Sequence, residues 1–121
     1  MKPTVIIGAS ENPHRYSYKA ANLLKKHGHQ IFPYGIREGK VADEFIDTAR
    51  EHNTLRNIDT ITLYINPAHQ VDWYDFIVHS KPKRVIFNPG TENPELESIL
   101  DQSGIPYEEA CTLVLLNTDQ Y

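Results

Sequence analysis

The chain has 121 residues, of which 40% are apolar and 23% are charged, and its formal net charge is -4. These values predict one domain over residues 1–121. They argue against a nucleic-acid-binding protein, which normally gathers an excess of basic residues on one face. No apolar segment is long enough to span a bilayer, no signal peptide opens the chain, and one cysteine forms no internal disulfide. We therefore expect a cytoplasmic protein.

The first predicted element is a buried strand over residues 4–7, because apolar residues run there without interruption. Gly8 ends this strand and begins a small polar loop, in which a ligand can approach bare backbone. A helix is predicted over residues 18–27, beginning near Ser17 and stopping at Gly28. A loop between a buried strand and a helix N-terminus predicts a phosphate-binding, nucleotide-type site.

Strands and helices then alternate along most of the chain. Strands are predicted over residues 30–35, 59–65, 83–87 and 105–108, with a short one favoured at 44–47. Helices are predicted over residues 67–80, with Val71, Tyr74, Ile77 and Val78 inward, and over 94–103, with Asn93 as cap and Gly104 as terminator. Residues 53–57 are predicted as loop, and residues 110–116 as a terminal turn or helix. This alternation predicts an α/β, Rossmann-like three-layer sandwich with a mostly parallel five-stranded sheet.

The expected ligand site lies beyond the carboxyl ends of the strands, where the strand order reverses. The loops predicted at that edge are residues 8–17, 33–40, 66–67 and 88–92. They contain much of the chain's glycine, proline and asparagine. We therefore expect these loops to form one rim around a ligand.

The first loop departs from the dinucleotide-binding motif G-x-G-x-x-G. Ser10 and Pro13 stand where the second and third glycines would be. Arg37 lies where an NAD site would have an acidic residue for the ribose hydroxyls. Arg37 and Lys40 suit a phosphorylated ribose, which both NADP and coenzyme A carry, although solvated surface charges are the better interpretation of these two residues taken alone.

Two runs, VIIGASENPHRYS at residues 5–17 and HGHQIFP at residues 27–33, resemble the small stand-alone CoA-binding proteins. These are similar to the CoA-binding domain of the succinyl-CoA ligase alpha subunit and of ADP-forming acyl-CoA synthetases. Further matching runs are VIFNPGTE at residues 85–92, GIP at 104–106 and ACTL at 110–113. The resemblance covers essentially the whole chain.

The resemblance implies a set of cofactor-binding positions for CoA: Gly8, Ala9, Ser10, Asn12, Arg15, Ser17, Lys19, Pro33, Gly35, Arg37, Asn66 and Pro67. Residues 8–10 would cradle phosphate with help from the helix start and the nearby cations. Residues 33–37 would line the adenosine 3'-phosphate end, and residues 66–67 would flank the pantetheine. For Ser17, a simple N-cap is an alternative role.

Three functions are compatible with these observations. The first is a module that binds CoA or acyl-CoA without catalysis, because no nucleophile–base pair is recognisable. The second is an enzyme role, either as an NADP-dependent reductase or as an accessory subunit of an acyl-CoA ligase. The third is a regulatory module that senses nucleotides. The ligase alpha subunit carries its phosphorylated histidine in a second domain, whereas a chain of 121 residues is expected to form one domain.

The remaining reactive side chains predict no second site. The six histidines show no metal-ligand spacing with a carboxylate or with Cys111, so no metal site is expected. Cys111 is predicted to be a buried small hydrophobe, with a mixed disulfide to the CoA thiol as the alternative. Trp73, Tyr74 and Tyr121 would form a homodimer face if they were exposed.

Overall fold

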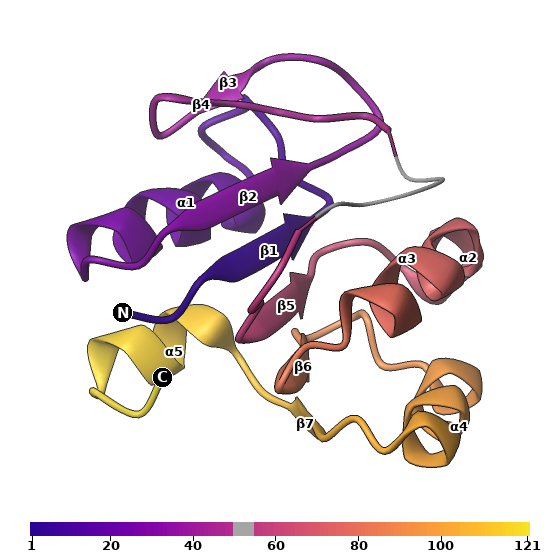
Figure 1. The fold of residues 1–121 in the computed structure, drawn as a ribbon. Helices are drawn as coiled ribbons and strands as arrows, with labels where there is room; N and C mark the ends of the chain where they lie inside the picture. Colours follow the sequence, from indigo (N-terminus) through magenta and orange to yellow (C-terminus); the bar gives the residue numbers. More distant parts are fainter. Residues whose placement is uncertain (50–54) are drawn as a thin grey trace.

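A parallel sheet forms the centre of the computed structural model, which describes residues 1–49 and 55–121 (Figure 1). Its five strands are β1 (Thr4–Ile7), β2 (Ile31–Tyr34), β5 (Thr60–Leu63), β6 (Arg84–Phe87) and β7 (Tyr107–Glu109). All neighbouring pairs are parallel, in the order β2-β1-β5-β6-β7. The predicted α/β, Rossmann-like architecture is therefore confirmed. Successive strands are added on opposite sides of β1, so the strand order reverses between β1 and β5.

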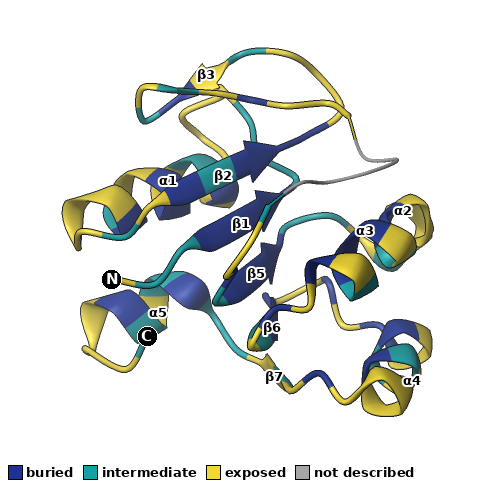
Figure 2. Cartoon of the chain, viewed as in Figure 1, coloured by how far each residue is buried: buried dark blue, intermediate teal, exposed yellow. Residues whose placement is uncertain are grey.

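Helices cover both faces of this sheet (Figure 1). They are α1 (Tyr16–Lys26), α2 (Pro67–Gln70), the 3₁₀ turn η1 (Val71–Trp73), α3 (Tyr74–Ser80), α4 (Pro94–Ser103) and α5 (Thr112–Asn117). Strand side chains alternate between the faces. Ile6 packs on the α1–α5 side, and Val5 and Ile7 pack on the side of α3 and α4. The two cores leave the central strands buried, as the dark blue strands of Figure 2 show.

Helix α4 matches its prediction at both ends, Pro94–Ser103. Asn93 caps the helix by accepting hydrogen bonds from the amides of Glu95 and Leu96, and Gly104 ends it in the left-handed conformation. Local capping chemistry therefore determined both boundaries.

The single helix predicted over residues 67–80 is wrong, because η1 separates α2 from α3. A 3₁₀ turn has three residues per turn, so it changes which side chains face the sheet. Val71, predicted inward, is 54% exposed, whereas Trp73 is buried against Phe76. The shift in helical phase also removes Trp73 from any dimer face.

The short strand predicted at residues 44–47 is part of an antiparallel hairpin, β3 (Lys40–Val41) with β4 (Glu44–Phe45). Its turn uses Ala42 and Asp43, both with positive φ. Neither is the glycine or asparagine that usually signals such a turn, which is why the sequence did not predict it. In the loop predicted at residues 53–57, residues 53 and 54 lie outside the described residues, and residues 55–57 form no helix or strand.

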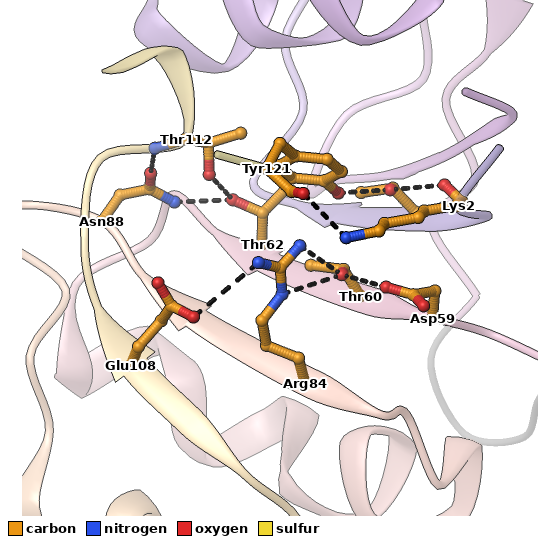
Figure 3. A network of polar contacts seen from close by, with 10 residues as sticks. Lys2, Asp59, Thr60, Thr62, Arg84, Asn88, Glu108, Thr112 and Tyr121 are labelled. Atoms are coloured by element: carbon orange, nitrogen blue, oxygen red, sulfur yellow. Dashed lines mark hydrogen bonds and ion pairs between the residues drawn. The ribbon is translucent and has the colours of Figure 1, made fainter. Parts of the chain in front are cut away.

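A polar network closes the amino edge of the sheet around Tyr121 (Figure 3). The Tyr121 hydroxyl shares a hydrogen bond with the hydroxyl of Thr4, and its ring lies 4.6 Å below the Arg84 guanidinium. Lys2 Nζ donates to the Tyr121 carbonyl at 2.7 Å. Tyr121 therefore holds the segment after α5 against the sheet and is engaged inside the chain, contrary to a role in a dimer face.

Charge is separated along the sheet. Residues 1–49, which form the β2 half with its hairpin, contain seven Lys and Arg and five acidic residues. Residues 85–121 contain seven acidic residues and no Lys or Arg, and β6, α4 and β7 place most of them at the other end. The net charge of -4 therefore conceals a positive end and a negative end.

Candidate functional site

The loop after β1 is tied to the end of β2 by two hydrogen bonds. The amides of Gly8 and Ala9 both donate to the Tyr34 carbonyl at 2.9 Å. The resemblance assigns these amides to a phosphate, but each already has a backbone acceptor. An anion at this edge therefore needs other donors.

Two glycines allow three loops to pack backbone against backbone. Gly8 has φ +97°, and a Cβ there would lie 2.8 Å from Ile65 Cγ2 and 2.9 Å from the Tyr64 carbonyl carbon. A Cβ on Gly35 would lie 2.6 Å from the Ala9 carbonyl oxygen. These glycines bring together the loops after β1, β2 and β5, which is a structural use of the missing side chains.

The rest of the β1–α1 loop is a tight turn built by two polar side chains. Ser10 Oγ accepts from the Asn12 amide, and Asn12 Oδ1 accepts from the His14 amide, both at 3.0 Å. This Asx turn brings the chain into helical geometry at Tyr16, with Arg15 at the N-cap position. The helix start predicted near Ser17 is therefore correct to one residue, whereas the N-cap alternative for Ser17 is wrong. Ser17 lies inside the first turn and is 4% exposed.

Anion-binding groups remain next to that turn. Within the described ranges, the amides of Ser10 and Glu11 have no hydrogen-bond partner. The first-turn amides of α1 likewise lack an intrahelical partner, and a helix of 11 residues directs its positive dipole end toward this loop. Arg15 and Lys19 add exposed cations. The geometry therefore suits a phosphate bound by residues 10 and 11 and the start of α1, rather than by residues 8 and 9.

At the end of β2, only part of the predicted loop reaches the edge of the sheet. Pro33 was predicted to open that loop, but it is buried inside β2, where its carbonyl accepts from the Asp47 amide at 3.0 Å. A proline is tolerated there because β2 is an edge strand. Arg37 is exposed beyond the strand, and Lys40 lies in β3 with Nζ 5.4 Å from the Phe45 ring. Of the residues assigned to the adenosine end, Arg37 is the one with an exposed charge.

Residues 66 and 67 follow β5, across the strand-order reversal from the first loop. Pro67 is the first residue of α2, as predicted, and Asn66 caps the helix by accepting from the His69 amide at 3.2 Å. Asn66 is exposed. Both residues therefore line this edge while serving as a helix start.

Below these residues lies a buried amide network that the sequence did not reveal. Gln70 is fully buried and donates to the carbonyls of Ile65 and Thr91, at 2.9 and 2.8 Å. Its own carbonyl accepts from Asn93 at 2.8 Å. The network joins the loop after β5 to the loop after β6. Its partners are far apart in the sequence, so no local pattern identifies it.

Asn88 forms a second buried junction, between β5, β6 and α5 (Figure 3). Its Nδ2 donates to Thr62 Oγ1 and the Leu63 carbonyl, and its Oδ1 accepts from the Thr112 amide. Cys111 precedes that amide at the N-cap position of α5 and is half-buried, less enclosed than predicted. The loop after β6 is therefore held by its asparagine, and the mixed-disulfide alternative for Cys111 stays a prediction.

A pair of carboxyl groups lies near the end of β7. Burial, followed by the neighbouring Glu109 carboxylate, raises the pKa of Glu97 to about 7, and Asp101 and Glu92 act in the same direction. Because the folded chain then takes up a proton near pH 7 that the unfolded chain takes up near 4.5, this group stabilises the fold increasingly as the pH falls between those values.

Replacement of this carboxyl is expected to change the pH dependence of stability. Glu97→Gln should raise the unfolding free energy at pH 8 by about 1 kcal/mol. The substitution removes the repulsion between the Glu97 and Glu109 carboxylates, which solvent partly screens. The measurement is urea denaturation at several pH values, read as the variant-minus-parent difference, because His29, whose pKa is lowered mainly by burial, acts in the opposite sense. Glu38→Gln, at an exposed site, is the control. A difference that does not change between pH 8 and 5 would contradict the prediction.

Among the described residues, no group of three or more His, Cys, Asp and Glu side chains is placed to hold a metal ion. His52 lies outside the described residues. No described helix has both the length and the apolar character needed to cross a membrane.

Comparison with known proteins gives one family and several similar structures. A family model described as a CoA binding domain matches residues 2–117. A solved structure described as an uncharacterized protein is 48% identical, with TM-score 0.95, and the match covers 100% of this chain and 98% of that chain. A hypothetical protein from Pyrococcus horikoshii OT3 is 19% identical with TM-score 0.85, covering 95% of this chain and 81% of that one. A protein from Thermus thermophilus is 18% identical with TM-score 0.83, covering 99% and 90%.

The last two matches concern the fold alone, because identity is low. None of the curated proteins compared matches the chain.

Proposed function

Since the chain belongs to the CoA-binding domain family, we propose that it binds coenzyme A or an acyl-CoA at the carboxyl edge of its sheet, without catalysing a reaction of its own. The observation that carries the proposal is the free backbone at Ser10 and Glu11 beside the start of α1. These donors lie at the reversal between β1 and β5, where parallel sheets bind ligands.

In this proposal the diphosphate lies over the β1–α1 loop. The amides of Ser10 and Glu11, with the first turn of α1, would donate to phosphate oxygens. Arg15 and Lys19 would supply positive charge from the same segment. Gly8 and Gly35 would act indirectly, by allowing the loops to pack closely enough to form the rim.

The two ends of the ligand would extend to either side of that loop. Arg37, exposed after β2, would face the 3'-phosphate of the adenosine. Residues 66–67, across β1, would flank the pantetheine. This assignment keeps the positions that the resemblance implies, apart from five. Pro33, Gly35 and Ser17 are buried, and the amides of Gly8 and Ala9 already donate to the Tyr34 carbonyl.

A binding role without catalysis is supported by how the polar side chains of this edge are used. The side-chain amides of Gln70 and Asn88 are committed to backbone groups of neighbouring loops. Asn66 serves as a helix cap. These side chains therefore stabilise the rim, and bound CoA would be presented to a separate acyl-CoA enzyme.

Calorimetric titration of the full chain with CoA, NADP, NAD and ATP tests the proposal. We expect heat of binding with CoA and a weaker or absent signal with the others. Binding of NADP alone would overturn the proposal in favour of a reductase or NADP sensor. Binding of none of the four would favour a regulatory module without this ligand.

Two substitutions test the assigned contacts. Arg15→Gln should weaken CoA binding by about tenfold, the equivalent of one charge-assisted contact of about 1.4 kcal/mol. Arg37→Gln should weaken CoA by a similar factor but leave 3'-dephospho-CoA unchanged, because its proposed partner is the 3'-phosphate. Lys83→Gln, exposed just before β6, is the matched charge control. Equal losses for both ligands in Arg37→Gln would contradict the assignment.

A further inference from the structure

A groove runs between α1 and α5 on the face of the sheet that these two helices cover. Its volume is about 620 Å³, and its lining residues are Pro13, Tyr18, Lys19, Asn22, Leu23, Lys26, Leu113 and Asn117. The floor is largely apolar, and the charged groups of the lining are both lysines. Lys19 and Lys26 are seven residues apart on α1, which places them on one face of the helix about 10 Å apart along its axis. The groove therefore suits an apolar side chain accompanied by acidic groups.

The β3–β4 hairpin carries such a side chain. Phe45 is 80% exposed, although an aromatic ring normally contributes much buried area. Acidic residues stand close to it in the chain, at Asp43, Glu44 and Asp47. Glu44 is engaged with Lys25 at 3.2 Å, and Lys40 lies against the Phe45 ring, which leaves Asp43 and Asp47 as exposed carboxylates. An exposed aromatic with acidic neighbours is complementary to the lysine-edged groove.

The hairpin and the groove lie on either side of the same helix. Lys25 of α1 donates to the Ala42 carbonyl of the hairpin turn at 3.0 Å, and α1 packs against α5 on its other side. Figure 1 shows β3 and β4 above α1 and α5 below it. If the α1 helices of two copies approach each other, the hairpin of each copy therefore comes within reach of the groove of the other.

We propose that this face is a homodimer interface, in which Phe45 of each copy inserts into the α1–α5 groove of the other. A two-fold axis beside α1 pairs each hairpin with the partner's groove, so the contact is repeated and the assembly closes at two copies. Asp43 and Asp47 then approach Lys26 across the interface, at the end of α1 away from the β1–α1 loop. Tyr16 and Val114, both exposed at the groove's helices, enlarge the apolar contact.

The negative end of the chain is a less suitable occupant of the groove. Helix α4 carries acidic residues, but its exposed positions are proline and polar side chains, and its leucines are buried. Its isoleucine, Ile99, is half-buried against the core, so the helix offers no exposed aliphatic or aromatic side chain for the floor. The hairpin supplies both the charge and the aromatic ring, and because two small contacts are made, we expect association in the micromolar range.

Sedimentation velocity of the full chain across micromolar concentrations tests this inference. We expect a concentration-dependent monomer–dimer equilibrium that weakens as salt is added, because the charged pairs are screened. Phe45→Ser and Lys26→Glu should each weaken the dimer at least tenfold while leaving the thermal unfolding of the monomer unchanged. Val71→Ser, which removes an exposed apolar side chain on the opposite face, should leave the dimer intact.

Mixing the two disabled variants gives the sharpest result. A heterodimer of Phe45→Ser with Lys26→Glu keeps one intact contact, the hairpin of the second variant in the groove of the first. Because Phe45 and Lys26 belong to the same contact, losing both there should cost less than the sum of the two separate losses. The mixture should therefore associate more strongly than either variant alone. A parent chain that is monomeric throughout, assembly beyond dimers, or a mixture no stronger than its components would overturn the proposal. Calorimetry with CoA on the same samples measures ligand binding separately.

Discussion

Replacement of Gly8 by alanine is expected to lower the free energy of unfolding by about 3 kcal/mol. Two effects add. An L-residue at φ +97° is strained, and the new Cβ would lie within 3.0 Å of Ile65 Cγ2 and of the Tyr64 carbonyl group. The Tyr64 atoms are backbone, so relief requires the loops after β1 and β5 to separate. Urea denaturation monitored by circular dichroism measures the loss.

Gly28 provides the matched control. Its φ is also positive, at +85°, but no atom lies within 4 Å of the position that a Cβ would take. Gly28→Ala should therefore show only the conformational penalty, about 1 kcal/mol. The difference between the two variants isolates the steric contribution of loop packing. Equal losses would show that close approach at Gly8 is unimportant.

Replacement of Asn88 by alanine is expected to be similarly damaging, at about 3 kcal/mol. The truncation leaves the Leu63 carbonyl and the Thr112 amide without their buried partner and opens a cavity below the start of α5. Asn88→Asp should lose a comparable amount at neutral pH, because a carboxylate would face the Leu63 carbonyl and the Thr62 hydroxyl with no hydrogen to donate. Denaturation of both variants measures the effect.

Asn22→Ala serves as the comparison for these two variants. Asn22 is exposed on α1 and donates to the Tyr18 carbonyl within its own helix. Its loss should change stability by no more than about 0.5 kcal/mol. An Asn88→Asp variant as stable as the parent would contradict the role of Asn88 as a donor.

The parts of the fold that follow from the sequence are those determined by neighbouring residues. Asn93 and Gly104 predicted both ends of α4, and the apolar runs predicted the five strands of the sheet to within a few residues. The break at η1 and the turn at Ala42 were not predictable in this way. Both depend on how the chain packs against the sheet, and neither carries a glycine or proline at the break.

The candidate site shows the same division. The loops at the carboxyl edge were expected from the strand pattern, and Asn66 and Pro67 begin α2 there. Which amides of the first loop are available was not predictable. That depends on the Tyr34 carbonyl, more than twenty residues away, which accepts from Gly8 and Ala9. Gln70 was missed for a related reason, since its role is defined by acceptors in two other loops.

The separation of charge along the sheet has a kinetic consequence for an anionic ligand. CoA carries several negative charges, and the chain as a whole is also negative. A uniform distribution of that charge would slow their encounter. Because the acidic residues gather toward β7 and the basic ones around α1 and β2, the field repels the ligand from one end and attracts it to the other. In the proposed binding mode, the first encounter would thereby be oriented, so that phosphate groups arrive on the side of the molecule where the β1–α1 loop lies.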